Sequence, residues 1–328
     1  MTGLSDSFKR PINYLRISVT DRCNLCCIYC MPAEGVCTIP HSDILTYEEI
    51  RTIVVAGAEL GINKTRITGG EPLVRLGLNK LIRMLAQIDA IDDISLTTNG
   101  VLLGRYAAEL KSAGLRRVNV SLDTLKPDKF KFITHSDKLG DVLEGIEVAR
   151  SVGLNPVKIN VVVMAGVNDD EVLDFAAKTI DDDWHVRFIE LMPFAGKGAT
   201  DPQFVSARNI KKRLDPLGKL EPYMPSMGCG PAKYFRFPQA KGTVGFITPI
   251  SEHFCVSCNR LRLTADGKLR SCLLADDEID LKQPLRSSGI SPAGLKQLIK
   301  QAVNNKPPCH HLAEGYIPED RPFCQVGG

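Results

Sequence analysis

Six short apolar runs alternate with amphipathic stretches through the first two-thirds of this 328-residue chain. The β-rich runs are 14–19, 65–68, 94–97, 118–122, 157–164 and 186–191, and the helical patterns occupy 47–60, 78–88, 106–113, 142–152 and 170–180. Nearly continuous apolar runs such as 160–164 are typical of strands that are buried on both faces of a parallel sheet. Repeated β-then-α units imply right-handed crossovers, so the pattern predicts either an open, doubly wound sheet or a barrel.

Polar residues and glycines stand just after most of the predicted strands. They are Asp21, Gly69, Gly70, Glu71, Asn99 and Asp123. Folds of this class usually bind their ligands at the C-terminal ends of the parallel strands. We therefore expect a site at this edge of the sheet.

The sequence changes character after about residue 193, where proline and glycine become frequent and the alternation stops. Residues 243–249, and the pair 260–264 and 268–272, are predicted to form hairpin strands. Residues 291–305 have the pattern of one more amphipathic helix. We place a domain boundary near 194–207, which divides the chain into 1–200 and 201–328.

The cysteines are the informative part of the composition. A net charge of only +3 provides no bulk attraction to nucleic acid or to an anionic membrane. No apolar stretch approaches the length of a membrane span, so we expect a cytoplasmic protein. Disulfides are rare in reducing cytosol, and eleven cysteines, several of them in tight clusters, therefore indicate metal or redox chemistry.

The first cluster follows the first predicted strand and contains Cys23, Cys27 and Cys30. Three thiolates hold three irons of a 4Fe–4S cube and leave the fourth iron open to another ligand. An alternative is a zinc knuckle, because Cys26 would complete Cys-x2-Cys pairs within the same segment. In the cluster interpretation Cys26 is a spare thiol.

This spacing after a first strand resembles the radical S-adenosylmethionine (SAM) superfamily, and Thr68-Gly-Gly-Glu-Pro72 strengthens the resemblance. The resemblance implies that SAM binds the open iron and contacts a small set of residues. They are Tyr29, Gly70 at the SAM amino group, Ser121 at the carboxylate or ribose, and Met192 at the adenine. The simpler alternatives are a tight turn at 69–70, a strand-end hydroxyl at Ser121 and a core side chain at Met192.

A second triplet, Cys255, Cys258 and Cys272, surrounds the predicted hairpin. It would suit a second 4Fe–4S cluster with an open iron facing substrate. His253 would instead allow a four-ligand zinc ribbon. Arg260 and Arg262 alternate on one strand between the cysteines, so their side chains point to the same face.

The segment 255–273, together with 15–23, 66–72, 97–100 and the final Gly327-Gly328, resembles the GTP 3′,8-cyclase family over essentially the whole chain. The resemblance implies an incomplete parallel (β/α)6 TIM-like barrel with a C-terminal domain that carries a second iron–sulfur cluster. It also implies that GTP lies between the clusters. The implied GTP contacts are Arg16, Arg66, Thr97, Lys158, Arg260, Leu261 and Arg262, and the implied catalytic set is Cys23, Cys27, Cys30, Arg16, Gly327 and Gly328.

The activity implied by this resemblance is that of a radical SAM lyase. A 5′-deoxyadenosyl radical takes the C3′ hydrogen of GTP, and the product is (8S)-3′,8-cyclo-7,8-dihydroguanosine 5′-triphosphate, in the first step of molybdenum cofactor biosynthesis. The implied partners are a one-electron reductant, a second copy of the chain and a downstream cyclic pyranopterin monophosphate synthase. The alternatives are another radical SAM enzyme with an auxiliary cluster, and a zinc-binding protein without enzymatic activity.

Some metal-like residues are left outside both predicted sites. The segment 306–311 ends in Cys309, His310 and His311, and we interpret it as a packed turn. The scattered Cys37, Cys229, Cys309 and Cys324 are interpreted as structural or free thiols.

Overall fold

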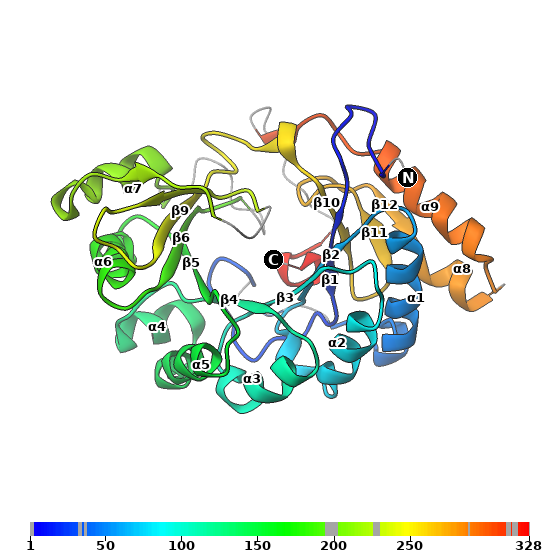
Figure 1. Ribbon diagram of the computed structural model, residues 1–328, viewed down its shortest axis with the longest axis horizontal. Coiled ribbons are helices and arrows are strands. Elements are labelled where there is room, and N and C mark those ends of the chain that lie inside the picture. Colours follow the sequence, from blue (N-terminus) through cyan, green and yellow to red (C-terminus); the bar gives the residue numbers. More distant parts are fainter. Residues whose placement is uncertain are drawn as a thin grey trace.

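The computed structural model describes residues 3–31, 35, 38–193, 203–225, 230–287, 289–312, 316 and 321–327. Within these residues twelve strands form one sheet, in the order β12-β11-β10-β1-β2-β3-β4-β5-β6-β9-β8-β7. The sheet curves around a central space, in which the C-terminal end of the chain lies (Figure 1).

Six parallel strands form the middle of the sheet. They are β1 (Tyr14–Ser18), β2 (Lys64–Thr68), β3 (Asp93–Thr98), β4 (Arg117–Ser121), β5 (Lys158–Val163) and β6 (His185–Glu190). They follow one another in chain order, so the sheet has no point at which the winding direction reverses, as it would in a doubly wound fold. The predicted incomplete barrel is therefore confirmed.

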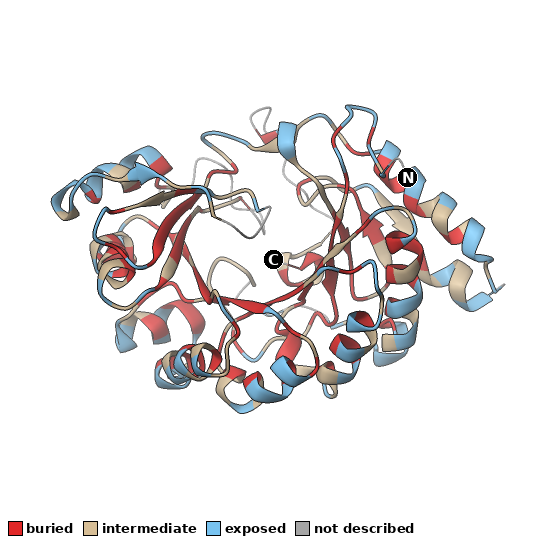
Figure 2. Ribbon diagram, in the orientation of Figure 1, coloured by how far each residue is buried: buried red, intermediate tan, exposed pale blue. Residues whose placement is uncertain are grey.

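Amphipathic helices cover the outer, convex face of these strands. They are α1 (Tyr47–Ala58), α2 (Leu78–Ala86), α3 (Leu103–Ser112), α4 (Pro127–Thr134), α5 (Leu139–Ser151), α6 (Val172–Asp181) and α7 (Ala207–Arg213). In Figure 2 their exposed faces point away from the sheet, and their buried faces meet the strands. Helix α1 begins at a capping box, because the Thr46 hydroxyl accepts from the backbone N–H of Glu49 and the Glu49 carboxylate accepts from that of Thr46.

The C-terminal third adds strands to both edges of the barrel. On one edge β10 (Arg260–Leu263) lies parallel to β1 and continues into β11 (Lys268–Arg270) and β12 (Glu278–Asp280). On the other edge β9 (Thr243–Ile247) lies parallel to β6 and continues into β8 (Lys233–Arg236) and β7 (Glu221–Pro222). Three further helices are α8 (Lys282–Ser287), α9 (Pro292–Asn304) and α10 (Phe323–Val326).

The structure refines several predictions about local elements. The antiparallel pair at 260–264 and 268–272 is present as β10 and β11. Of the predicted strand 243–249, residues 243–247 form β9, which lies between β6 and β8 and so belongs to the barrel as well as to a hairpin. Helix α4 was not predicted, because its eight residues interleave lysines with phenylalanines and are too few to establish a period. Across the described ranges, no helix is both long and apolar enough to cross a membrane.

Candidate functional site

A cavity of about 280 Å³ lies inside the curve of the sheet, and both cysteine triplets line it. Most of the residues predicted to bind SAM or GTP line it too. These are Arg16, Cys23, Cys27, Tyr29, Cys30, Arg66, Gly70, Thr97, Ser121, Met192, Cys255, Cys258, Arg260, Arg262 and Cys272. The fold thus brings together side chains from several strands and from loops more than 200 residues apart.

The two triplets lie toward opposite ends of the same two strands. Cys23 follows the C-terminal end of β1, whereas Cys258 precedes the N-terminal end of β10. Strands β1 and β10 are parallel, with Tyr14 beside Arg260 and Arg16 beside Arg262. The cavity therefore runs along the strands from one triplet to the other, and it is not confined to the C-terminal edge that the sequence predicted.

The loop of the first triplet packs against the turn at Gly69 and Gly70. The backbone N–H of Gly70 donates to the Thr20 carbonyl at 2.7 Å, and that of Glu71 donates to the Arg22 carbonyl at 2.8 Å. A Cβ at Gly69 or Gly70 would lie 2.5 or 2.4 Å from these same two oxygens. Only glycine permits this approach, so the Gly-Gly pair sets the position of the cysteine loop.

Buried acids lie beside the first triplet, whose own thiols are half-buried. Burial raises the pKa of Cys23 to about 11, and it also raises the pKa values of Cys27 and Cys30. The Tyr29 hydroxyl donates to Asp123 at 2.6 Å, and burial raises the pKa of Asp123 to about 6. Glu71 accepts from Thr98 and from the Asn99 backbone, and burial raises its pKa to about 7.

The second triplet has basic neighbours instead. The Arg260 guanidinium lies over the Phe254 ring at 4.9 Å and approaches the Cys258 sulfur at 3.8 Å. The Lys306 ammonium is buried and donates to the carbonyls of Arg260, at 2.9 Å, and of Ser271. Burial by itself would raise the pKa of Cys258, but the charges of Arg260 and Lys306 and the contacts with Arg260 bring it down to about 7.

A row of buried arginines crosses the sheet between the triplets. Arg262 on β10, Arg16 on β1 and Arg66 on β2 occupy one register position, so their side chains leave the same face of three adjacent strands. Burial, followed by the charges of Arg262 and Arg66, lowers the pKa of Arg16 well below its usual value. Such a concentration of desolvated positive charge favours an anionic ligand in the cavity.

Lys158 does not line this cavity. It is buried at the start of β5, donates to the Tyr234 hydroxyl at 3.2 Å, and lines a second cavity of about 360 Å³. Burial lowers the pKa of Lys158 to about 8. Leu261 alternates with Arg260 and Arg262, so its side chain points the other way, into the hydrophobic core.

The C-terminal tail enters the central space near the first triplet. The Gly327 carbonyl accepts a hydrogen bond from the Arg262 guanidinium. Gly327 has φ +73°, and a Cβ on it would lie 2.8 Å from Thr68 and 3.2 Å from Ser18. Gly328, which was predicted to act with it, lies outside the described residues, as do Cys37 and Cys229.

The predicted SAM contacts lie on three sides of the cavity. Tyr29 and Gly70 belong to the first loop and the turn against it, and Ser121 ends β4 beside Asn160 of β5. Met192, just after β6, packs with Cys272 and Phe323 around Leu274 and Leu312. Met192 therefore combines a place in an apolar cluster with a place in the cavity wall.

Sequence reasoning missed several cavity residues. The main ones are Asn160, Arg187, His310 and Cys324. Asn160 and Arg187 share a register position on β5 and β6, so the inward face of each strand was the signal that could have identified them. His310 comes from the segment interpreted as a packed turn; its Nε2 contacts the Pro249 carbonyl at 2.8 Å, and its ring meets that of His253 edge-on at 5.5 Å.

The surroundings of the thiols fit iron–sulfur clusters. Backbone N–H groups lie 3.4 Å from the Cys23 and Cys272 sulfurs, and the Asn99 amide lies 3.7 Å from that of Cys23. Hydrogen bonds to thiolate sulfur of this kind tune iron–sulfur centres.

Known protein families match both parts of the chain. The family described as "Radical SAM superfamily" matches residues 17–178, and "Molybdenum Cofactor Synthesis C" matches residues 184–312. Among solved structures, Streptococcus suis SuiB has a TM-score of 0.59 at 13% identity and covers 95% of this chain and 67% of its own. A structure titled "Native anSMEcpe with bound AdoMet" has a TM-score of 0.50 at 19% identity, with 63% of this chain and 60% of its own covered. These likenesses establish the fold.

Curated relatives are far more similar. A protein of Moorella thermoacetica named GTP 3′,8-cyclase is 51% identical over 99% of this chain and 100% of its own length. A protein of the same name from Pelotomaculum thermopropionicum is 52% identical, with the same coverage of both chains. With the two cysteine triplets on one cavity, this full-length similarity shows that the chain belongs to the GTP 3′,8-cyclase family.

Proposed function

We propose that this protein is a GTP 3′,8-cyclase, a radical SAM lyase that catalyses the first step of molybdenum cofactor biosynthesis. One observation carries the proposal: a single cavity has a cysteine triplet toward each end and a row of buried arginines between them. Such an arrangement suits an enzyme that generates a radical at one position and holds a triphosphate at another. GTP is converted to (8S)-3′,8-cyclo-7,8-dihydroguanosine 5′-triphosphate.

SAM and an iron–sulfur cluster are the cofactors. Cys23, Cys27 and Cys30 would hold a 4Fe–4S cluster, which, when reduced and bound to SAM, supplies the 5′-deoxyadenosyl radical that abstracts the C3′ hydrogen of GTP. We further propose a second 4Fe–4S cluster on Cys255, Cys258 and Cys272. Their place on the same cavity and the basic side chains beside them support this assignment.

The substrate contacts follow from charge and register. Arg16, Arg66 and Arg262 would bind the negative charge of GTP, because arginine stays charged when buried and can donate two parallel hydrogen bonds. Arg260 would orient the guanine end beside Cys258. Thr97 and Lys158 would add a hydroxyl and an ammonium from β3 and β5, and Leu261 would contribute packing behind the arginines.

The SAM contacts would come from the opposite end. Gly70 would offer backbone groups to the amino end of SAM, Ser121 a hydroxyl, and Met192 an apolar surface to the adenine. Tyr29 would hold Asp123 in place, which their 2.6 Å hydrogen bond supports. Gly327 and Gly328 would cover the radical site and exclude water from it, and the contact of Gly327 with Arg262 supports that role.

The remaining parts of the proposal concern the protein's setting. We propose a cytoplasmic homodimer that receives electrons from a one-electron reductant and passes its product to a cyclic pyranopterin monophosphate synthase. We also propose that 1–200 and 201–328 are the two domains. The two family matches, which meet between 178 and 184, support a division of this kind, although the strands of the second part continue the sheet of the first.

Anaerobic turnover tests the proposed function directly. The reconstituted protein is incubated with dithionite, SAM and GTP, and 5′-deoxyadenosine and the cyclised nucleotide are measured by liquid chromatography and mass spectrometry. We expect both products in equal amounts. Formation of 5′-deoxyadenosine without any GTP-derived product would indicate a radical SAM enzyme with another substrate, and a colourless zinc protein would contradict both assignments.

A further inference from the structure

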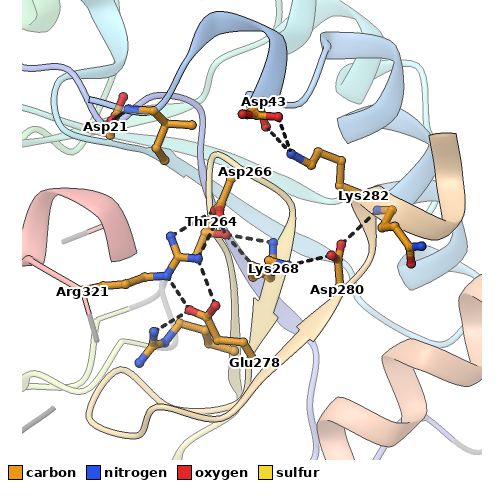
Figure 3. Close-up of polar contacts among 12 residues, drawn as sticks. Asp21, Asp43, Thr264, Asp266, Lys268, Glu278, Asp280, Lys282 and Arg321 are labelled. Atoms are coloured by element: carbon orange, nitrogen blue, oxygen red, sulfur yellow. Dashed lines mark hydrogen bonds and ion pairs between the residues drawn. The ribbon is translucent and has the colours of Figure 1, made fainter. Parts of the chain in front are cut away.

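The C-terminal tail is attached to the turn that follows β10, at the opposite end of that strand from Cys258. Arg321 precedes α10 and lies beside Asp266, in the turn between β10 and β11, and beside Glu278, at the start of β12 (Figure 3). From there the tail runs through the buried Cys324 and Val326 to Gly327, whose carbonyl accepts from Arg262. The described tail is thus held by one arginine at its start and contacts another at its end.

The Arg321 guanidinium uses both of its edges. Its Nη1 and Nη2 donate to the two Asp266 oxygens at 3.2 and 2.8 Å. Its Nη2 and Nε contact the two Glu278 oxygens at 2.9 and 2.7 Å. All three side chains are largely buried, with 14% of Arg321, 16% of Asp266 and 19% of Glu278 exposed. A planar guanidinium can bind two carboxylates in this way, whereas an ammonium cannot.

The carboxylates are themselves held in place before Arg321 reaches them. The Thr264 hydroxyl donates to Asp266 at 2.6 Å, and Arg270 donates to Glu278 at 2.6 Å. Because Arg270 is buried and 1% exposed, Glu278 is anchored to the interior of the hairpin. Arg321 therefore binds two carboxylates whose positions are held by other side chains of the hairpin.

We propose that Arg321 is a positioning residue. Its ion pairs with Asp266 and Glu278, here called the clamp, attach the tail to the hairpin and so hold Gly327 against Arg262. The clamp acts at a distance, through the helix that links Arg321 to Gly327. When it is released, the Gly327 carbonyl leaves Arg262, and that guanidinium loses the contact that orients it in the cavity. The effect on turnover depends on the proposed function, whereas the docking of the tail does not.

Hydrogen–deuterium exchange of the reconstituted enzyme, without GTP or SAM, tests the docking. In Arg321→Gln we expect the amides of 321–327 to exchange about fivefold faster, the change that loss of an ion-pair network of about 1 kcal/mol produces. The exchange rate of Arg321→Lys should lie between those of the parent enzyme and Arg321→Gln, because lysine keeps the charge but loses the contact with one carboxylate. Lys268→Gln is the matched control: it removes the 2.6 Å ion pair between Lys268 and Asp280 on the same hairpin, which does not involve the tail (Figure 3).

Two further measurements separate positioning from a loss of folding. In a double-mutant cycle, Asp266→Asn should add little to the exchange rate once Arg321 is Gln, because both changes break the same contact, that between Arg321 and Asp266. In turnover assays, Arg321→Gln should raise the KM for GTP about fivefold, because Arg262 is less well oriented. It should also lower the yield of cyclic product per 5′-deoxyadenosine, because Gly327 no longer covers the radical site. Lys268→Gln should match the parent enzyme in both.

Unchanged tail exchange in a folded Arg321→Gln variant would overturn the proposal, as would fully additive effects in the cycle. If Arg321→Gln does not fold, as judged by circular dichroism and Tm, then Arg321→Lys decides in the same way. If the parent enzyme makes no cyclic product, the proposed function is contradicted, and the docking of the tail by Arg321 is then tested by the exchange measurement alone. A parent enzyme that turns over, with tail exchange that does not respond to Arg321, contradicts the clamp alone.

Discussion

The two cysteine triplets share a cavity but differ in the charge of their surroundings. The first lies among buried acids, and the charges of Glu71 and Asp123 add to burial in raising the pKa values of Cys23 and Cys27. The second lies among cations, and Arg260 and Lys306 lower the pKa of Cys258. The thiolate form is thus disfavoured at Cys23 and Cys27 and favoured at Cys258, whereas burial raises the pKa of Cys255 as well.

This difference suits two separate tasks. A site with negative neighbours resists extra electron density, which favours a strongly reducing centre there. A site with positive neighbours stabilises both bound thiolates and an anionic substrate. The Arg262 end of the arginine row lies in the second environment, since the charges of Cys272 and Cys258 act on Arg262. We therefore expect the first triplet to control SAM chemistry and the second to control the handling of GTP.

The largest test replaces one cysteine in each triplet. Cys27→Ala should abolish 5′-deoxyadenosine formation, because it removes a ligand of the proposed SAM cluster. Cys272→Ala should retain SAM binding and yet lose the cyclic product. Chromatography of both products and equilibrium binding of SAM provide the measurements. Full GTP conversion by Cys272→Ala would eliminate the distinction between the two triplets.

The next test concerns the arginine row. Arg262→Lys should lower kcat/KM for GTP about 100-fold, the cost of losing a charge-assisted bidentate contact in a buried site. It should leave SAM affinity unchanged, because the change lies in the row beside the second triplet. Steady-state kinetics and SAM binding check both expectations. An equal loss of SAM affinity would mean that the two environments are not separate.

The acidic surroundings of the first triplet predict a pH dependence of stability. Since burial raises the pKa of folded Asp123 to about 6, the native state holds this proton more tightly than the unfolded chain does. The contribution of Asp123 to stability is therefore full below its ordinary pKa near 4 and is lost as the pH rises through about 6, on the order of 3 kcal/mol.

Asp123→Asn should remove that part of the dependence. An asparagine can still accept from the Val162 backbone and can donate to the Tyr29 oxygen, so the local contacts survive. Chemical denaturation of the cluster-free protein between pH 4 and 7 measures the effect. If both proteins lose the same stability over this interval, the burial of Asp123 is not the cause.

The smallest effect should be seen in the second environment. Arg260→Gln removes a positive charge 3.8 Å from the Cys258 sulfur and should lower the midpoint potential of the cluster proposed there. About 60 mV is expected, the one-electron equivalent of about 1.4 kcal/mol. Redox titration followed by electron paramagnetic resonance should show an unchanged potential for the first cluster. A shift in both would contradict the local origin of the difference.

The motifs near each cysteine were readable from the sequence, because short-range spacing determines them. Cys23, Cys27 and Cys30 share one loop, and Arg260 and Arg262 share one face of a strand whichever fold contains it. The six β-then-α units likewise predicted the parallel barrel, since crossover handedness leaves few alternatives. These features depend on neighbours along the chain.

Long-range register decided the rest. Strand β10 could have paired anywhere at a sheet edge, and its place beside β1 is what aligns Arg262 with Arg16 and puts the second triplet at the opposite end of the cavity. Arg187 on β6 and Arg321 in the tail have no local motif, and they acquire meaning only from partners far away in the sequence. The sequence by itself determined the two cysteine triplets and the barrel. Tertiary structure decided that the triplets share one cavity, because contacts between distant segments set the distance between them and the charge of their surroundings.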